Sequence, residues 1–165
     1  MMIKFFLGVA IVGFCAFCGY LFAKKYRQRK LFFSQLATFN ERFINEISYY
    51  RRPLVQFASA YAYKGEFSLL LEYFFRDVEN APRRLDECLQ DGVYAFLKKE
   101  EKGFIKDYFL SLGRGDSASQ KTHFCSLQTL LQKQREEAET TCKKYADLYV
   151  KLGFLFGLLV LILII

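Results

Sequence analysis

The chain has 165 residues, a length that a single domain ordinarily occupies. Its hydrophobic fraction is 53%, and its formal net charge is +7 at pH 7. Such a charge is compatible with nucleic-acid binding, but the densest basic run directly follows an apolar segment. Membrane topology and lipid headgroups already account for cations in that position, so we predict no nucleic-acid partner.

The N-terminal segment, residues 1–23, is predicted to be a membrane anchor. From Phe5 to Ala23 there is no charged residue, and a helix of that length covers about 28 Å, close to the roughly 30 Å of a hydrocarbon core. A cleaved signal peptide is the alternative, since Lys4 precedes the apolar run as in such signals. The run is longer than the usual apolar region of a signal, and Ala16-Phe17-Cys18 is a poor cleavage site. A retained anchor is therefore favoured.

The C-terminal segment, residues 148–165, is predicted to be a second anchor. Residues 152–165 carry no charge, and the apolar stem of Lys151 lets its ammonium group reach the interface. Cations flank the inner ends of both anchors: Lys24, Lys25, Arg27, Arg29, Lys30, Lys143, Lys144 and Lys151. Lys and Arg accumulate on the cytoplasmic side of membranes. We predict a multi-pass cell-membrane protein whose middle domain, residues 24–147, is cytoplasmic.

The middle domain is predicted to consist of helices joined by short turns. Apolar residues spaced by three and four extend the first helix to about Tyr50, and Pro53 suits the start of a second. A third helix is expected over Phe67 to Val78. A fourth begins near Asn80 and stops near Gly92, and a fifth covers Lys98 to Leu112.

The clearest helix punctuation precedes the last helix. Gly113 and Gly115 can close the fifth helix, and Asp116 can cap the next. From Phe124 to Leu152, residues stepping by three and four form a heptad seam, so one helix is expected from about Ser117 to the C-terminus, antiparallel to the first. The predicted fold class is all-α: an antiparallel bundle of about six helices, whose first and last are long and continuous with the transmembrane segments.

The cysteines do not indicate redox or metal chemistry. Cys15 and Cys18 have CxxC spacing, but an apolar helix lacks the electropositive setting that activates a thiol. The remaining three are scattered through the middle domain, and an odd total in a cytoplasmic domain favours reduced thiols. No zinc-ligand spacing and no phosphate-binding loop is present.

Other polar residues also fail to form an active site. His123 is the only histidine, and the adjacent pairs Glu100-Glu101 and Glu136-Glu137 point about 100° apart on a helix. Arg114-Gly115-Asp116 matches a cell-adhesion tripeptide, but helix punctuation explains it. A small membrane enzyme would need a polar cluster facing a cavity, and none is visible. We predict a noncatalytic protein with no catalytic residue, cofactor or metal.

Aromatic residues point instead to a binding surface. The chain has 11 tyrosines, and five of them, at residues 49, 50, 61, 63 and 73, are more than such a small bundle can bury. Exposed tyrosine is common at protein interfaces. Core packing remains the alternative for each one singly. The candidate partner surface consists of Tyr49, Tyr50, Arg51, Arg52, Tyr61, Tyr63 and Tyr73.

Short motifs in a fixed order give the chain a resemblance to a known family. They are Glu46-Ile47-Ser48-Tyr49 with Pro53-Leu54, then Leu112-Gly113-Arg114-Gly115-Asp116 with Gln120, and finally Lys144-Tyr145, Tyr149-Val150-Lys151-Leu152-Gly153, Leu155 and Gly157-Leu158. In this order, over nearly the whole chain, the sequence resembles stage III sporulation protein AB of endospore-forming bacteria. Residues 76–100 depart most from the family pattern and lack its tryptophan.

The resemblance implies a function that the residues alone do not. Members belong to the channel complex between mother cell and forespore, and their soluble domain is similar to that of the platform protein of type II secretion and type IV pilus systems. The implied partners are membrane lipid, other membrane subunits of the complex, and a secretion-type ATPase, stage III sporulation protein AA. The expected role is a platform that couples the ATPase to the membrane assembly. A secretion or pilus platform outside sporulation is the alternative, although such platforms usually repeat the helical domain.

Overall fold

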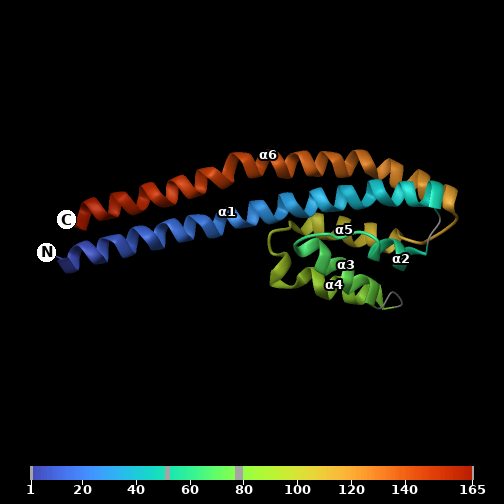
Figure 1. Cartoon of the computed structure of the whole chain (residues 1–165), viewed down its shortest axis with the longest axis horizontal. Coiled ribbons are helices and arrows are strands. Elements are labelled where there is room, and N and C mark those ends of the chain that lie inside the picture. The colour runs from blue at the N-terminus through green and yellow to red at the C-terminus, as the bar shows by residue number, and fades with distance from the viewer. Residues whose placement is uncertain (1, 51–52, 77–79, 165) are drawn as a thin grey trace. The chain divides into compact units, whose positions relative to one another are not determined.

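The computed structural model describes residues 2–50, 53–76 and 80–164, and these contain helices and no strand (Figure 1). The helices are α1 (Met2–Asn45), α2 (Leu54–Ser59), α3 (Glu66–Arg76), α4 (Ala81–Gln90), α5 (Lys99–Ser111) and α6 (Ser117–Ile164). They form two compact units. One contains the chain up to Arg27 and from Glu137 onward, and the other contains Gln28–Glu136. The predicted all-α class with six helices is confirmed.

The long first helix changes its hydrogen-bonding pattern before it ends. A π-helical turn, Glu46–Tyr50, directly follows α1, so helical structure reaches the expected end at Tyr50. In the last turns the hydroxyl of Ser48 donates to the carbonyl oxygen of Ile44 at 2.8 Å. Short π-helical stretches occur often at functional sites in proteins. Pro53, with φ of −53°, precedes α2, where its missing N–H costs no helical hydrogen bond.

Tight turns separate the later helices. Gly113 and Gly115 have φ of +76° and +87°, a region that L side chains adopt at a cost. The carboxylate of Asp116 then accepts from the backbone N–H groups of Ala118 at 3.2 Å and Ser119 at 3.4 Å, which caps α6. Hydrogen bonds from Ser119 lower the pKa of this carboxyl.

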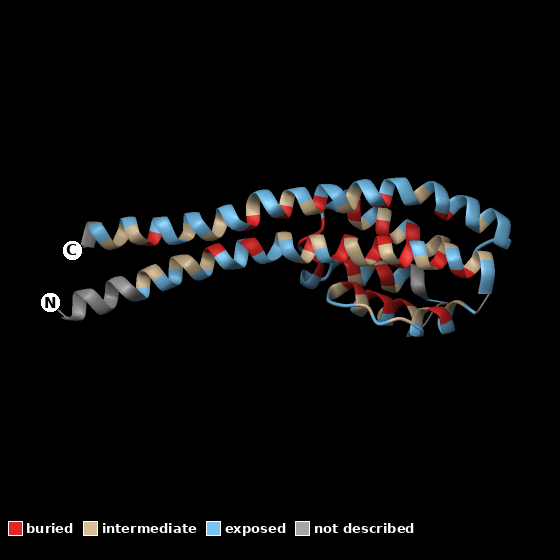
Figure 2. Ribbon diagram, turned by 45° about the horizontal axis from the view of Figure 1, so that its top comes forward, coloured by how far each residue is buried: buried red, intermediate tan, exposed pale blue. Residues whose placement is uncertain are grey.

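The Gln28–Glu136 unit has a core built from aromatic rings. Figures 1 and 2 show its part of α1 between α6 and the short helices, with buried residues concentrated along α1. Phe39 is fully buried at the centre, with ring centroids 5.3 Å from Phe57, 5.8 Å from Phe67 and 6.3 Å from Phe109. Such pairs add to the stabilisation that burial alone provides. The apolar stripe on α1 thus holds α2, α3 and α5 in place.

A buried polar chain crosses the same core. The hydroxyl of Tyr108 on α5 donates to Oδ1 of Asn40 on α1 at 3.1 Å, and Nδ2 of Asn40 donates to the carbonyl oxygen of Phe124 on α6 at 3.3 Å. Tyr108 and Asn40 are fully buried, so these hydrogen bonds replace those lost to water. The three helices are thereby fixed in one register.

The other unit is an antiparallel pair formed by the first part of α1 and the last part of α6. A Cβ placed on Gly19 would lie 2.6 Å from the carbonyl oxygen of Tyr149, and one on Gly153 would lie 2.7 Å from that of Cys15. The backbones therefore meet where side chains are absent, as in small-residue helix pairs of membranes. A small core of Ala23, Cys142 and Ala146 continues the contact.

One expectation for this pair was wrong. The heptad seam was expected to run through Leu148 and Leu152, but these side chains are 45% and 50% exposed. The contact passes through Ala146, Gly153 and Gly157 instead. Glycine allows the closer approach, and it therefore selects the face that packs, whereas leucine at the contact would hold the backbones apart.

The glycine contact predicts opposite effects for two substitutions in α1. G19A should destabilise the helix pair by about 1–3 kcal/mol, because the new methyl group would meet backbone atoms that cannot move independently. G13A is the matched control: nothing lies within 4 Å of the new Cβ, so it should be neutral or stabilising by up to about 1 kcal/mol. Thermal unfolding of the full chain in detergent measures both, and equal effects would contradict the close contact.

The buried Tyr108 predicts a loss of stability in alkali. Burial raises the pKa of its hydroxyl well above the usual value. Above about pH 10 the unfolded chain releases a proton that the folded chain retains, so the free energy of unfolding should fall by up to about 1.4 kcal/mol per pH unit for this group. Y108F should be less stable at pH 7, since Asn40 loses its donor, but should show a shallower decline from pH 10 to 12. Chemical unfolding across that pH range tests this, and an unchanged slope would contradict it.

Candidate functional site

Some of the polar residues that the sequence analysis rejected as catalysts can be placed in the structure. Among the described residues, no group of three or more His, Cys, Asp or Glu is placed to hold a metal ion. Glu100 is exposed whereas its neighbour Glu101 is buried, so the two carboxylates face different surroundings. His123 is exposed and lies edge-on to Phe124, with ring centroids 5.1 Å apart.

Two of the candidate tyrosines have exposed side chains at the end of the first helix. Tyr49 and Tyr50 close the π-helical turn with 79% and 67% of their surfaces accessible. Large exposed aromatic side chains at a helix end are suited to contact a partner. Arg51 and Arg52, which were assigned to the same surface, lie outside the described residues.

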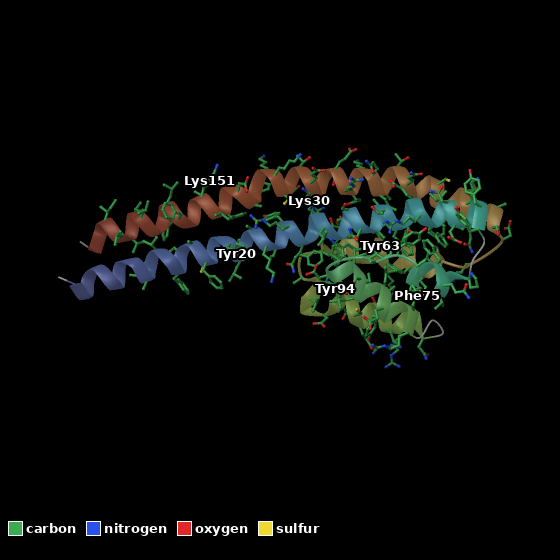
Figure 3. The ribbon with its side chains drawn as sticks, viewed as in Figure 1. Tyr20, Lys30, Tyr63, Phe75, Tyr94 and Lys151 are labelled. Carbon is green, nitrogen blue, oxygen red and sulfur yellow. The ribbon has the colours of Figure 1, made fainter. Side chains whose placement is uncertain are left out.

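The rings of two further candidate tyrosines contact an arginine of the same protein. The guanidinium carbon of Arg42 lies 4.3 Å from the ring centroid of Tyr61 and 5.4 Å from that of Tyr63, so one cation contacts two aromatic faces. The hydroxyl of Tyr63, labelled in Figure 3, is buried without a hydrogen-bond partner among the described residues. Burial raises its pKa, and the nearby Arg42 partly opposes the shift.

The tyrosines therefore divide into separate sets. Tyr61 and Tyr63 line a groove of about 310 Å³ whose walls also include Val55, Leu71 and Phe75. Tyr73 lines a second groove of about 620 Å³, and the guanidinium of Arg84 lies 4.7 Å from its ring centroid. Tyr49 and Tyr50 line neither groove. Of the five tyrosines, they alone offer most of their surface to a partner.

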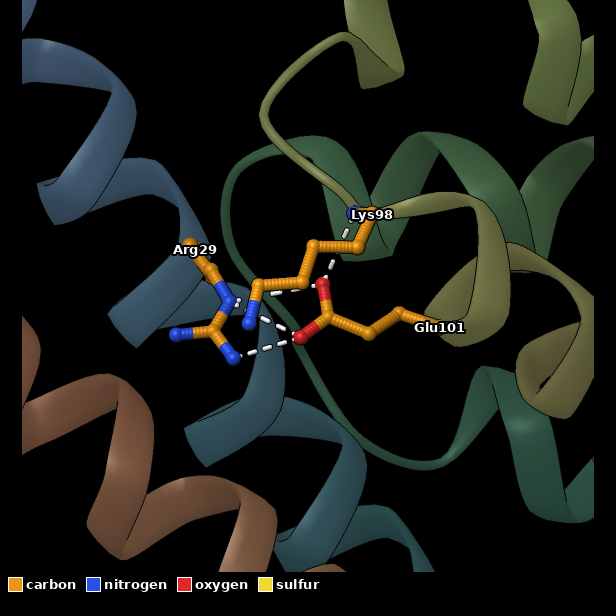
Figure 4. Close-up of polar contacts among 3 residues, drawn as sticks. All are labelled: Arg29, Lys98 and Glu101. Atoms are coloured by element: carbon orange, nitrogen blue, oxygen red, sulfur yellow. Dashed lines mark hydrogen bonds and ion pairs between the residues drawn. The ribbon is translucent and has the colours of Figure 1, made fainter.

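Reasoning from sequence missed a buried ion pair. Nε of Arg29 on α1 donates to Oε1 of Glu101 on α5 at 3.0 Å, and its Nη2 donates to the same oxygen at 2.5 Å (Figure 4). Oε2 of Glu101 also accepts from the backbone N–H of Lys98 at 2.9 Å, where α5 begins. One carboxylate thus caps α5 and joins it to α1. Arg29, predicted to flank the membrane with the other cations, is buried and engaged in this pair.

The sequence carried a signal for this pair. Arg29 lies three, four and seven residues before Phe32, Phe33 and Leu36, which are all buried on α1. A cation in phase with an apolar stripe is expected to face the core. A buried cation is usually paired with an acid. The identity of that acid depends on how α5 packs, which spacing within one helix does not reveal.

Six of the remaining membrane-flanking cations belong to the helix-pair unit, which also contains a cluster of tyrosines, whereas Lys30 belongs to the other unit and is half-buried. The ring of Tyr26 on α1 stacks on Tyr145 and Tyr149 of α6, with centroids 5.6 and 5.7 Å apart. Lys24, Lys25, Arg27, Lys144 and Lys151 are exposed along the same stretch. Figure 3 shows the side chain of Lys151 pointing away from α1. Lys143 is paired with Glu139 at 3.1 Å.

One helix has the length and composition to cross a membrane. Among the described residues, this is the helix that includes Ser117–Ile162. Its apolar part belongs to the helix-pair unit, together with the N-terminal part of α1. Membrane crossing by α1 and the cytoplasmic position of the middle domain remain predictions, as do the domain boundaries at residues 23 and 148.

The buried ion pair predicts that removing one charge is costly. E101Q should destabilise the protein by about 3–5 kcal/mol, because it leaves the Arg29 guanidinium buried without a counter-charge. The double variant R29M/E101L should recover most of the loss, since apolar residues of similar size can replace such a pair.

A more accessible ion pair supplies the control for this prediction. Lys106 and Asp86 are joined at 2.8 Å, and their side chains are 30% and 51% exposed, so D86N should cost less than about 1 kcal/mol. Thermal unfolding of the four full-length proteins compares these values. A small effect of E101Q, equal to that of D86N, would show that the pair is hydrated in solution.

Comparisons with known proteins then identify the chain's relatives. The family model described as stage III sporulation protein AB matches residues 4–165, which is nearly the whole sequence. No curated protein and no solved structure gave a significant match. The resemblance seen in the short motifs is confirmed by this match. The chain belongs to the stage III sporulation protein AB family.

Proposed function

We propose that the protein is a noncatalytic membrane platform subunit of the mother cell–forespore channel complex. In this role it couples a cytoplasmic secretion-type ATPase, stage III sporulation protein AA, to the other membrane subunits of the assembly. The observation that carries the proposal is the family match over residues 4–165, which associates the chain with sporulation. The family match does not itself name a channel, an ATPase or a platform role. These parts of the proposal come from what the family resemblance implies.

The helix-pair unit supports a membrane anchor. The apolar end of α6 is long enough to cross a bilayer, and its antiparallel partner in α1 is uncharged from Phe5 to Ala23. Helices that meet through glycines pack well in lipid, where burial of apolar surface drives no association. We propose a two-helix anchor with both termini outside the cytoplasm.

The helical unit Gln28–Glu136 supports a protein-binding role. The buried charges of Arg29 and Glu101 are paired with each other, whereas Tyr49 and Tyr50 are exposed at the end of the first helix. Residues that contact partners are often aromatic and exposed in the free protein. We propose that these two tyrosines, with Arg51 and Arg52, form part of the ATPase-binding surface.

Binding of the purified full chain to the sporulation ATPase tests the proposal. In detergent, Y49A/Y50A should weaken binding at least about tenfold if the pair contributes the 2 kcal/mol or more typical of interface hot spots. Leu69 and Val93 are also exposed apolar residues of the same unit. L69A/V93A is therefore the matched control and should bind normally.

The possible outcomes separate the parts of the proposal. Saturable binding that only Y49A/Y50A weakens supports both the platform role and its surface. Binding that neither variant affects would support the partner but reject this surface. No binding by a folded wild-type chain would argue against ATPase coupling and leave the membrane helices as the assembly interface.

A further inference from the structure

The helix-pair unit carries a narrow band in which tyrosines and cations coincide. Tyr26 stacks on Tyr145 and Tyr149, which places these residues of α1 and α6 at one level. Closer to the N-terminus of α1, Gly19 contacts Tyr149 and Gly153 of α6. Its neighbour Tyr20 therefore lies at about the same height along the helix pair as Lys151. From residue 20 to residue 27 a helix rises only about 10 Å. We call the residues of this band the interfacial collar: Tyr20, Lys24, Lys25, Tyr26, Arg27, Lys144, Tyr145, Tyr149 and Lys151.

The charge of the collar is strongly one-sided. Its five cations are all exposed, and the one acidic residue among them in sequence, Asp147, is exposed as well. The neighbouring Lys143 is already paired with Glu139 and adds no free charge. An excess of unpaired cations in so short a band creates a positive potential that attracts anions.

The tyrosines of the collar contact some of its cations. Arg27 lies 5.8 Å from the ring centroid of Tyr20, and Lys144 lies 5.4 Å from that of Tyr145, so two cations are held against aromatic faces. Aromatic belts with adjacent Lys and Arg are typical of the membrane–water interface. A bilayer of 40–45 Å with a core of about 30 Å leaves about 5–8 Å for each headgroup layer, so a collar about 10 Å high is tall enough to cover one such layer.

We propose that the interfacial collar binds the headgroups of anionic phospholipids and fixes the depth at which the helix pair sits in the bilayer. The proposal rests on the membrane anchor proposed above and adds the lipid class and the residues that recognise it. A basic surface for an acidic protein segment would not require tyrosines interleaved with the cations, nor an apolar helix pair on one side of them. These two features favour lipid as the occupant.

Lipid selectivity around the reconstituted full chain tests the proposal. The protein is placed in phosphatidylcholine vesicles that contain a trace of spin-labelled phosphatidylglycerol or spin-labelled phosphatidylcholine, and electron paramagnetic resonance measures the immobilised fraction of each. One basic residue near the surface contributes about 1 kcal/mol, which converts to about fivefold. We expect phosphatidylglycerol to be preferred about fivefold or more at low salt. The preference should largely disappear in 1 M salt, where the screening length is about 3 Å.

Matched variants assign the preference to the collar. K24Q/K25Q/R27Q removes three of the five collar cations and should lower the preference for phosphatidylglycerol severalfold, with Lys144 and Lys151 retaining a residual preference. K99Q/K121Q/K133Q removes the same charge from three exposed positions of the other unit and should leave the preference unchanged. Far-UV circular dichroism of the vesicles verifies that each variant remains helical.

Two results would overturn the inference. Equal immobilisation of both lipids by the inserted wild-type chain would reject the collar while leaving the membrane anchor intact, and would favour an acidic protein segment as the occupant. An equal loss of selectivity in both triple variants would assign it to net charge rather than to these positions. Failure of the wild-type chain to float with the vesicles would instead reject the anchor itself.

Discussion

The helical unit depends on one helix being buried on more than one side. Along α1 the side chains of Phe32, Phe33, Leu36 and Phe39 are almost fully buried, and so is Asn40, which contacts both α5 and α6. Isolated helices shorter than about 12–15 residues are marginal in water. Helices α2, α3 and α4 fall below that length, so they depend on packing against their neighbours. Helices α2 and α3 pack against Phe39 of α1, and α4 packs against α3 and α5.

This dependence explains why polar groups on α1 matter as much as its rings. Apolar packing alone tolerates small rotations of a central helix, whereas Arg29 and Asn40 must meet Glu101 and Tyr108 at hydrogen-bond distance. If α1 were rotated or shifted, both contacts would break and buried polar groups would be left unpaired. The aromatic core therefore supplies most of the stabilisation, while two polar contacts select the arrangement. Tyr49 and Tyr50, which we propose to bind the partner, lie at the end of the helix that these contacts hold in place.

Helices and their limits could be predicted because they are properties of short stretches of sequence. Proline at residue 53, the glycines before Asp116 and the three- and four-residue spacing of Phe39 and Phe43 each act locally. The partner of Arg29 and the exposed state of single tyrosines could not be predicted, because they depend on contacts between distant segments. Tyr61 and Tyr63 illustrate this: only the fold places Arg42 against both rings. The prediction of which face of α6 packs was wrong for a related reason. The face that packs is the one on which glycine lets the two backbones approach closely, not the most apolar one.

The glycine contact also bears on how a solute could pass through the channel complex that we propose for this protein. Between Gly19 and Gly153 the two backbones lie so close that a single added methyl group has no room. A file of water molecules or a solute needs far more space than a methyl group, so no conduit can run between the two helices of one chain. If the proposed complex contains a pore, several copies of this chain or several different subunits must surround it. Each helix pair would then form one continuous part of the pore wall.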